Sequence, residues 1–225
     1  MNDRNTRPRL AEFAGVVLVA FFACFALLAG LEARTDGRRA VIGEEASTSF
    51  LQHWERYRGA TYAAQTVFTR ERTGGSSLRA EGLRVQRPPD ELIVSLSDAE
   101  LRTDEGVTRC VGGVDAEDTR CFGPTTGVPY DERVRAELDA LASYFVGPEP
   151  LYEVTEREDG CFALDQVRPL PIAPYGRRAT FCFDDATGAL MRVEIVFDNG
   201  VIERTEVTSI DPQVTDEDLR LQPPG

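Results

Sequence analysis

Residues 191–207 read MRVEIVFDNGVIERTEV, two runs of alternating apolar and polar side chains on either side of Asp198-Asn199-Gly200. The pattern predicts a β-hairpin, because Asn-Gly turns favour the tight reversal between antiparallel strands. A two-residue turn would place Val193 opposite Glu206. A three-residue loop with a left-handed Gly200 would place Val193 opposite Thr205. We favour the second register, because it keeps one face of the hairpin apolar.

The rest of the chain after residue 43 continues this pattern and adds two helices. Apolar residues recur at helical spacing over 44–58 and 131–146, and Gly59 and Gly147-Pro148 follow as stop signals. Strands are predicted at 60–72, 77–86, 91–97, 101–110, 119–122, 151–156, 161–167, 178–183, 189–197 and 201–210. Because strands and helices do not alternate, a parallel sheet is disfavoured. We therefore expect an α+β fold in which a long curved antiparallel sheet wraps around one or two helices.

The apolar stripes of the two predicted helices have two readings. The first helix presents Phe50 and Trp54, and the second presents Leu138, Leu141 and Phe145. These side chains are candidates for lining a ligand cavity, since binding pockets are mostly apolar. They are equally suited to filling a dry core between the helices and the sheet.

The N-terminal region contains a long apolar run. Residues 13–31 read FAGVVLVAFFACFALLAGL, nineteen residues without a charge, which is enough for a helix to cross the hydrocarbon layer. We predict an uncleaved transmembrane helix here, after a cytoplasmic segment 1–12 and before a linker 32–43. A cleaved signal peptide or a lipoprotein signal at Cys24 are the alternatives. The run is long for a signal core, and it is not followed by small residues at both positions of a cleavage site.

Four cysteines after the apolar run indicate an oxidising compartment. They are Cys110, Cys121, Cys161 and Cys182, an even number in a region that follows a membrane segment. Three pairings are open, and we favour Cys110–Cys121 and Cys161–Cys182 because each joins neighbouring segments. A zinc site is the competing interpretation, but the spacings differ from Cys-x-x-Cys. We therefore predict a single-pass cell-membrane protein whose C-terminal domain, residues 44–225, is extracytoplasmic, with no metal site.

The charge of the region after Arg39 limits its partners. Nineteen arginines face thirty-four acidic residues there, a net charge of −15, and the whole chain contains no lysine. Such a domain should be repelled by nucleic acid. The absence of lysine also excludes Schiff-base chemistry on a lysine.

The C-terminal third resembles the ending of LolA/RseB-like domains, a superfamily that includes carriers of outer-membrane lipoproteins. The resemblance is carried by Phe181-Cys182-Phe183-Asp184, Thr187-Gly188, Met191 to Ile195, Asp198-Asn199-Gly200, Asp211 and Val214 to Asp218, with Leu219, Leu221 and Pro223 following. It implies an unfinished β-barrel closed on one side by helices, with an apolar interior that holds acyl chains. Sensor members of the superfamily restrain a regulatory membrane protein. Carriers are usually released, whereas this chain is predicted to be anchored.

These observations favour two functions. The first is a membrane-anchored extracytoplasmic domain that binds a hydrophobic ligand, either a lipid or a lipoprotein acyl chain. The alternative is an envelope sensor that contacts another envelope protein. We expect no enzyme, no catalytic residues and no cofactor, because the single histidine, His53, has no second histidine or cysteine near it in the sequence.

Overall fold

The computed structural model describes residues 41–72, 74–95, 98–112, 119–170 and 172–221, and for Val41 it describes the backbone only. Two helices and twelve strands form in this part of the chain. In chain order they are β1 (Val41–Ile42), α2 (Glu44–Gly59), β2 (Tyr62–Arg72), β3 (Leu78–Arg87), β4 (Asp90–Val94), β5 (Asp98–Thr103), β6 (Gly106–Val111), β7 (Arg120–Thr125), α3 (Tyr130–Phe145), β8 (Tyr152–Glu156), β9 (Cys161–Gln166), β10 (Arg178–Phe183), β11 (Leu190–Val196) and β12 (Val201–Asp211).

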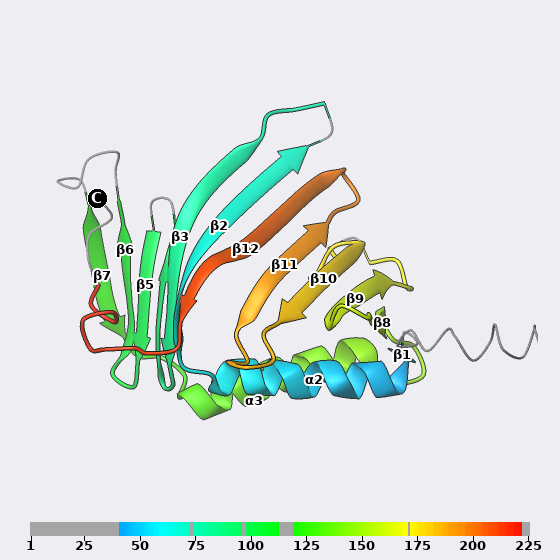
Figure 1. Ribbon diagram of the computed structural model, residues 1–225, viewed down its shortest axis with the longest axis horizontal. Helices are drawn as coiled ribbons and strands as arrows, with labels where there is room; N and C mark the ends of the chain where they lie inside the picture. Colours follow the sequence, from blue (N-terminus) through cyan, green and yellow to red (C-terminus); the bar gives the residue numbers. More distant parts are fainter. Residues whose placement is uncertain (1–40, 73, 96–97, 113–118, 171, 222–225) are drawn as a thin grey trace, which may run out of the picture. The chain divides into compact units, whose positions relative to one another are not determined.

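All the strands belong to one antiparallel sheet that stays open (Figure 1). Its order is β1-β8-β9-β10-β11-β12-β2-β3-β4-β5-β6-β7, so two meanders meet where β12 pairs with β2. β12 and β2 are the longest strands, each of eleven residues, and they curve away from the helices (Figure 1). The predicted curved antiparallel sheet of an α+β fold is confirmed.

The hairpin of β11 and β12 has the three-residue loop that the sequence favoured. Val193 lies opposite Thr205, and the Phe197 amide donates to the Val201 carbonyl at 2.9 Å. Gly200 has a φ of 75°, the left-handed conformation that this loop requires. The register therefore keeps Val193 on the face of the sheet that packs against the helices.

One face of the sheet, which we call the helix-facing face, packs against α2 and α3 over strands β8 to β11. Phe50 of α2 is fully buried there, and its ring contacts the rings of Phe162 and Phe181, each at a centroid distance of 5.4 Å. The apolar stripe of α2 thus packs into a core that lies between the two helices and the sheet, which we call the main core.

The opposite face, which we call the outer face, has a smaller core of its own. Val85 and Leu92 are buried there beneath Leu219 of the C-terminal segment, and Val214 and Leu221 pack around them. The last part of the stretch that carried the resemblance, residues 214–221, therefore covers the outer face of β3 and β4.

Two of the predicted boundaries were wrong. The single strand expected at 101–110 is two strands, β5 and β6, joined by a tight turn at Asp104-Glu105 that leads into Gly106. Gly106 has a φ of 135°, and an added Cβ would lie 2.2 Å from the Thr125 carbonyl oxygen, so a glycine is required there. In addition, the last part of the predicted linker 32–43 belongs to the sheet, since β1 (Val41–Ile42) pairs with β8.

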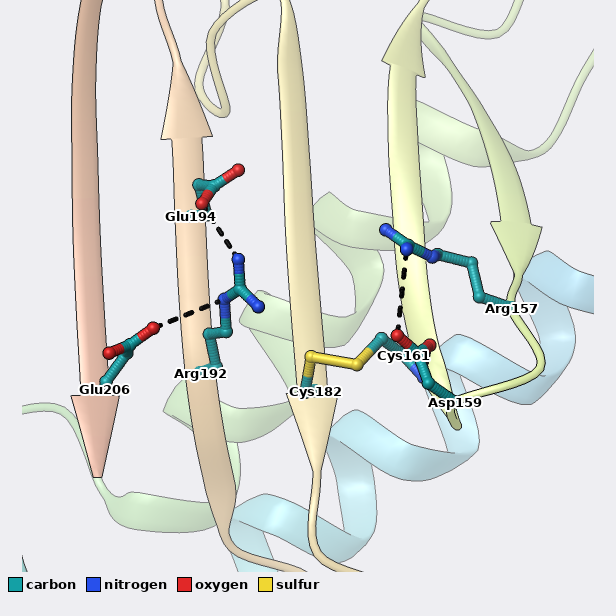
Figure 2. Close-up of a disulfide and its surroundings, with 7 residues drawn as sticks. All are labelled: Arg157, Asp159, Cys161, Cys182, Arg192, Glu194 and Glu206. Carbon is teal, nitrogen blue, oxygen red and sulfur yellow. Dashed lines mark hydrogen bonds and ion pairs between the residues drawn. A yellow bond between two sulfur atoms is a disulfide. The ribbon is translucent and has the colours of Figure 1, made fainter. Parts of the chain in front are cut away.

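The two favoured disulfides, Cys110–Cys121 and Cys161–Cys182, are confirmed. Each joins residues that lie directly opposite each other on neighbouring strands, β6 with β7 and β9 with β10. Figure 2 shows the second bridge on the outer face of the sheet, beside the ion pairs that Arg192 forms with Glu194 and Glu206.

The predicted cytoplasmic segment, transmembrane helix and most of the linker lie outside the described residues. Within residues 41–221, as far as they are described, no helix has the length and apolar character needed to span a bilayer. The membrane anchor at Phe13 to Leu31 therefore stays a prediction.

Candidate functional site

Three of the five predicted ligand-binding residues lie in the main core. Phe50, Leu141 and Phe145 are 0%, 2% and 6% exposed. The ring of Phe50 meets that of Phe145 edge to face, with centroids 5.3 Å apart. Edge-to-face pairs of this kind add to the free energy gained by burial. These side chains fill the space between α2, α3 and the sheet.

The other two candidates are half-buried. Trp54 packs against the main core, and its indole nitrogen donates to the Glu137 carboxylate at 3.4 Å. Leu138, which directly follows Glu137 on α3, is also half-buried. Of the five, Phe145 lines a hollow of about 350 Å³ at the C-terminal end of α3. A ligand-binding role for the five residues stays a prediction.

A larger hollow lies between residues 130–140 of α3 and strands β5 and β6, and we call it the α3 hollow. Its volume is about 460 Å³, within the range of small-molecule pockets. Its walls are mostly apolar, with a few charged groups. The lining residues are Pro89, Arg102, Thr103, Val107, Gly127, Val128, Tyr130, Arg133, Ala136, Glu137 and Ala140.

A buried ionic network lies beside this hollow and attaches α3 to the sheet. Glu91 of β4 is 3.2 Å from Arg58 of α2 and 2.9 Å from Arg133 of α3. Arg58 also lies 3.2 Å from Glu137. The side chains of Arg58 and Glu91 are 5% and 3% exposed, so water screens their attraction little.

Tyr130 completes the network at the start of α3. Its hydroxyl donates to the Arg58 carbonyl oxygen, and its ring lies under the Arg133 guanidinium at 5.1 Å. Burial raises the pKa of Tyr130 above its usual value. The hydroxyl therefore stays protonated at neutral pH and can keep donating this hydrogen bond.

The electrostatics of Glu91 follow from its two arginine partners. Burial by itself would raise the pKa of this carboxyl, but the Arg58 charge and the hydrogen bonds from Arg133 and Arg58 outweigh burial and lower the pKa to about 2. Glu91 is therefore ionised throughout the physiological pH range. It acts as a fixed anion that pairs with Arg58 and with Arg133, and Arg133 lines the α3 hollow.

A second hollow, of about 370 Å³, opens over β2, β3 and β4. Thr66, Phe68, Ala80 and Gly82 are among the residues that line it. The Arg84 guanidinium, which donates to the Tyr57 hydroxyl at 2.6 Å, also lines this hollow. This part of the sheet thus presents apolar surface that α2 and α3 do not fill.

The residues of the α3 hollow were missed in the sequence because they come from three separate segments. Pro89, Val107 and Val128 have no shared periodicity, and only the folded sheet brings them together. One local signal was available. Ala136 and Ala140 are small residues four apart on α3, which leave room above one strip of the helix.

No group of histidine, cysteine, aspartate or glutamate side chains that could hold a metal ion occurs in the part of the chain that the structure describes. His53 lies against Phe162 at a ring distance of 5.1 Å, and its Nδ1 is 2.9 Å from the Ser49 carbonyl oxygen. Its contacts are those of a residue packed at the edge of the core.

No protein-family model and no curated protein sequence matches the chain. Among solved structures, a chain of the Pseudomonas aeruginosa MucA/MucB complex matches with 16% identity and a TM-score of 0.44, over 79% of this chain and 61% of that one. A LolA superfamily protein from Nitrosomonas europaea matches with 6% identity and a TM-score of 0.35, over 78% of this chain and 97% of that one. The domain is similar in fold to these proteins. It spans only about three-fifths of the MucA/MucB chain that it matches.

LprF from Mycobacterium bovis is a further similar structure, with 11% identity and a TM-score of 0.39 over 78% of this chain and 97% of that one. At such low identities the likeness concerns the fold alone.

Proposed function

We propose that this chain is a membrane-anchored extracytoplasmic protein that binds a hydrophobic ligand, a lipid or an acyl chain, in the α3 hollow. The observation that carries the proposal is the composition of that hollow. Val107, Val128, Ala136 and Ala140 provide apolar walls beside the ionic network of Arg133 and Glu137. An apolar pocket with a few placed polar groups is the usual form of a small-molecule site.

Two features taken together support an extracytoplasmic location for the folded domain. The two disulfides suit an oxidising environment, since the cytosol keeps thiols reduced. The apolar run at Phe13 to Leu31 is long enough to hold the chain in a bilayer. Three arginines before the run favour a cytoplasmic N-terminus, but three more follow it, so the orientation rests on the cysteines.

A single edge strand favours the second function, an envelope sensor that contacts another envelope protein. β7 is the last strand of the sheet, and all six of its residues are exposed (Figure 1). Phe122 of β7 is 59% exposed. An exposed edge can pair with an extended segment of a partner. The two functions are distinguishable, because filling the α3 hollow should abolish ligand binding and leave a contact at β7 unchanged.

Filling the α3 hollow should block ligand binding. In Ala140→Trp, the indole would occupy the space above α3. The probe is a fatty acid that carries a diazirine in its acyl chain. We expect photolabelling by this probe to fall about tenfold, which is equivalent to about 1.4 kcal/mol of binding free energy. The measurement uses the full chain in its native membranes, with labelled peptides of α3, β5 and β6 quantified by mass spectrometry.

Ser143→Trp is the matched control. Ser143 is exposed on the same helix and does not line the α3 hollow. Photolabelling in this variant should equal that of the unmodified protein. Equal labelling of the Ala140→Trp and Ser143→Trp proteins would show that the acyl chain does not occupy the α3 hollow.

A further inference from the structure

Exposed apolar side chains gather at the end of the domain where the chain leaves toward its N-terminus. The large exposed apolar residues at this end are Ile42, Val146, Val167, Leu170 and Ile172. Ile172 is 87% exposed, more than any other large apolar residue that the structure describes. Single exposed apolar residues need no explanation, but a group of them at one end indicates an interaction surface.

These residues come from three segments that lie close together. Val146 and Val167 line the same hollow, together with Gly43, which follows Ile42. Val167 and Leu170 line a neighbouring hollow. Figure 1 also shows β1, the end of α3 and the connection between β9 and β10 at the same end of the domain. We call this surface the apolar end.

The charge of the β9–β10 connection differs from that of the rest of the domain. Residues 167–178 contain three arginines and no acidic residue, in a region whose net charge is −15. The side chains of Arg168 and Arg178 are 51% and 63% exposed, although each also approaches one carboxylate, Glu149 and Asp165 respectively. Glu44, Glu153 and Asp198 also line the hollows at this end, so the arginines do not make it a basic patch. The exposed apolar side chains therefore carry the case for an interaction surface here.

We propose that the apolar end contacts the surface of a lipid bilayer, with Leu170 and Ile172 inserted among the headgroups. The inference rests on the anchoring part of the proposed function. Nine residues separate Leu31 from Val41, and a chain of this length reaches at most about 35 Å. If residues 13–31 are anchored, this linker keeps Ile42 within that distance of the bilayer, and the tether favours lipid over a protein partner.

The apolar end and the α3 hollow are separate surfaces. The hollow is lined by α3 residues from Tyr130 to Ala140, whereas Val146 of the apolar end directly follows the last residue of α3. No residue that the structure describes lines both the α3 hollow and the hollows at the apolar end, so each surface can be altered without the other.

Tryptophan fluorescence in vesicles tests the contact. The chain has one tryptophan, Trp54, which is half-buried and supplies a constant background. The full chain carrying Ile172→Trp is placed in vesicles of phosphatidylcholine and phosphatidylglycerol whose acyl chains carry bromine. We expect the added emission to be shifted to the blue and strongly quenched. In Leu78→Trp, the control at an exposed apolar residue that lies outside the apolar end, the added emission should be unquenched.

The outcomes of this experiment separate the membrane anchor from the bilayer contact. If the full chain floats with the vesicles and Ile172→Trp is quenched, the contact is supported, and adding Leu170→Glu should reduce the quenching. If the chain floats and Ile172→Trp is quenched no more than Leu78→Trp, the bilayer contact is refuted while the anchor stands. If the chain does not float, both the anchor and the contact are wrong. None of these three outcomes bears on photolabelling of the α3 hollow.

Discussion

Glu91→Gln is expected to lower the free energy of unfolding by about 3–5 kcal/mol, because it leaves the buried Arg58 without its main counter-charge. Arg58 and Glu91 are 5% and 3% exposed, and water cannot replace the lost carboxylate. Arg133 loses its partner at the same time. The measurement is urea unfolding of the full chain in mild detergent, followed by circular dichroism.

Glu206→Gln is the matched control for this change. Glu206 also faces two arginines, Arg192 at 3.7 Å and Arg204 at 3.8 Å, but its side chain is 51% exposed (Figure 2 shows the pair with Arg192). Exposed ion pairs contribute about 0–1 kcal/mol. A loss in Glu91→Gln no larger than that in Glu206→Gln would contradict the role of the network.

The lowered pKa of Glu91 predicts that the free energy of unfolding depends on pH. The pKa of Glu91 is about 2 in the folded protein and would be near its usual value of 4.5 in the unfolded chain. A lowered folded pKa contributes stability above the unfolded pKa, and this contribution is lost as the pH falls toward the folded pKa. The difference of about 2.5 pKa units corresponds to about 3 kcal/mol. The gap in stability between the native protein and Glu91→Gln should therefore narrow as the pH falls from about 5 to about 2.

Phe50→Ala should cost a similar amount, about 3–5 kcal/mol, for a different reason. The Phe50 ring is fully buried and lies within 6 Å of the rings of five other aromatic residues, so its removal leaves a cavity that the rigid sheet cannot close. The matched control is Phe122→Ala, at a ring that is 59% exposed. We expect a change within about 0.5 kcal/mol there, as at most surface positions. Equal losses in the two variants, measured by the same urea unfolding, would show that the main core does not depend on α2.

The features that were predictable from the sequence are those written in local patterns. The β11–β12 register followed from the alternation around Gly200, and both disulfides followed from the proximity of their cysteines along the chain. The stripe containing Phe50 identified the face of α2 that is buried. In each case the deciding residues lie within one hairpin, one helix or two neighbouring strands.

The features that escaped prediction depend on contacts between distant segments or on a single turn. The pairing of Glu91 with Arg58 and Arg133 joins three elements, and no spacing in the sequence indicates it. The α3 hollow escaped prediction for the same reason. Val107 of β6 and Ala140 of α3 line it together only in the folded protein. The turn between β5 and β6 was missed because Asp104-Glu105 is a weaker turn signal than Asn-Gly.

Native mass spectrometry of the full chain, released from mild detergent, shows whether the α3 hollow holds an acyl chain. We expect a bound lipid or fatty acid, seen as an added mass on the unmodified protein and on Ser143→Trp and lost in Ala140→Trp. Unmodified protein that carries no such adduct, or an adduct that Ala140→Trp retains in full, would contradict acyl-chain binding in the α3 hollow.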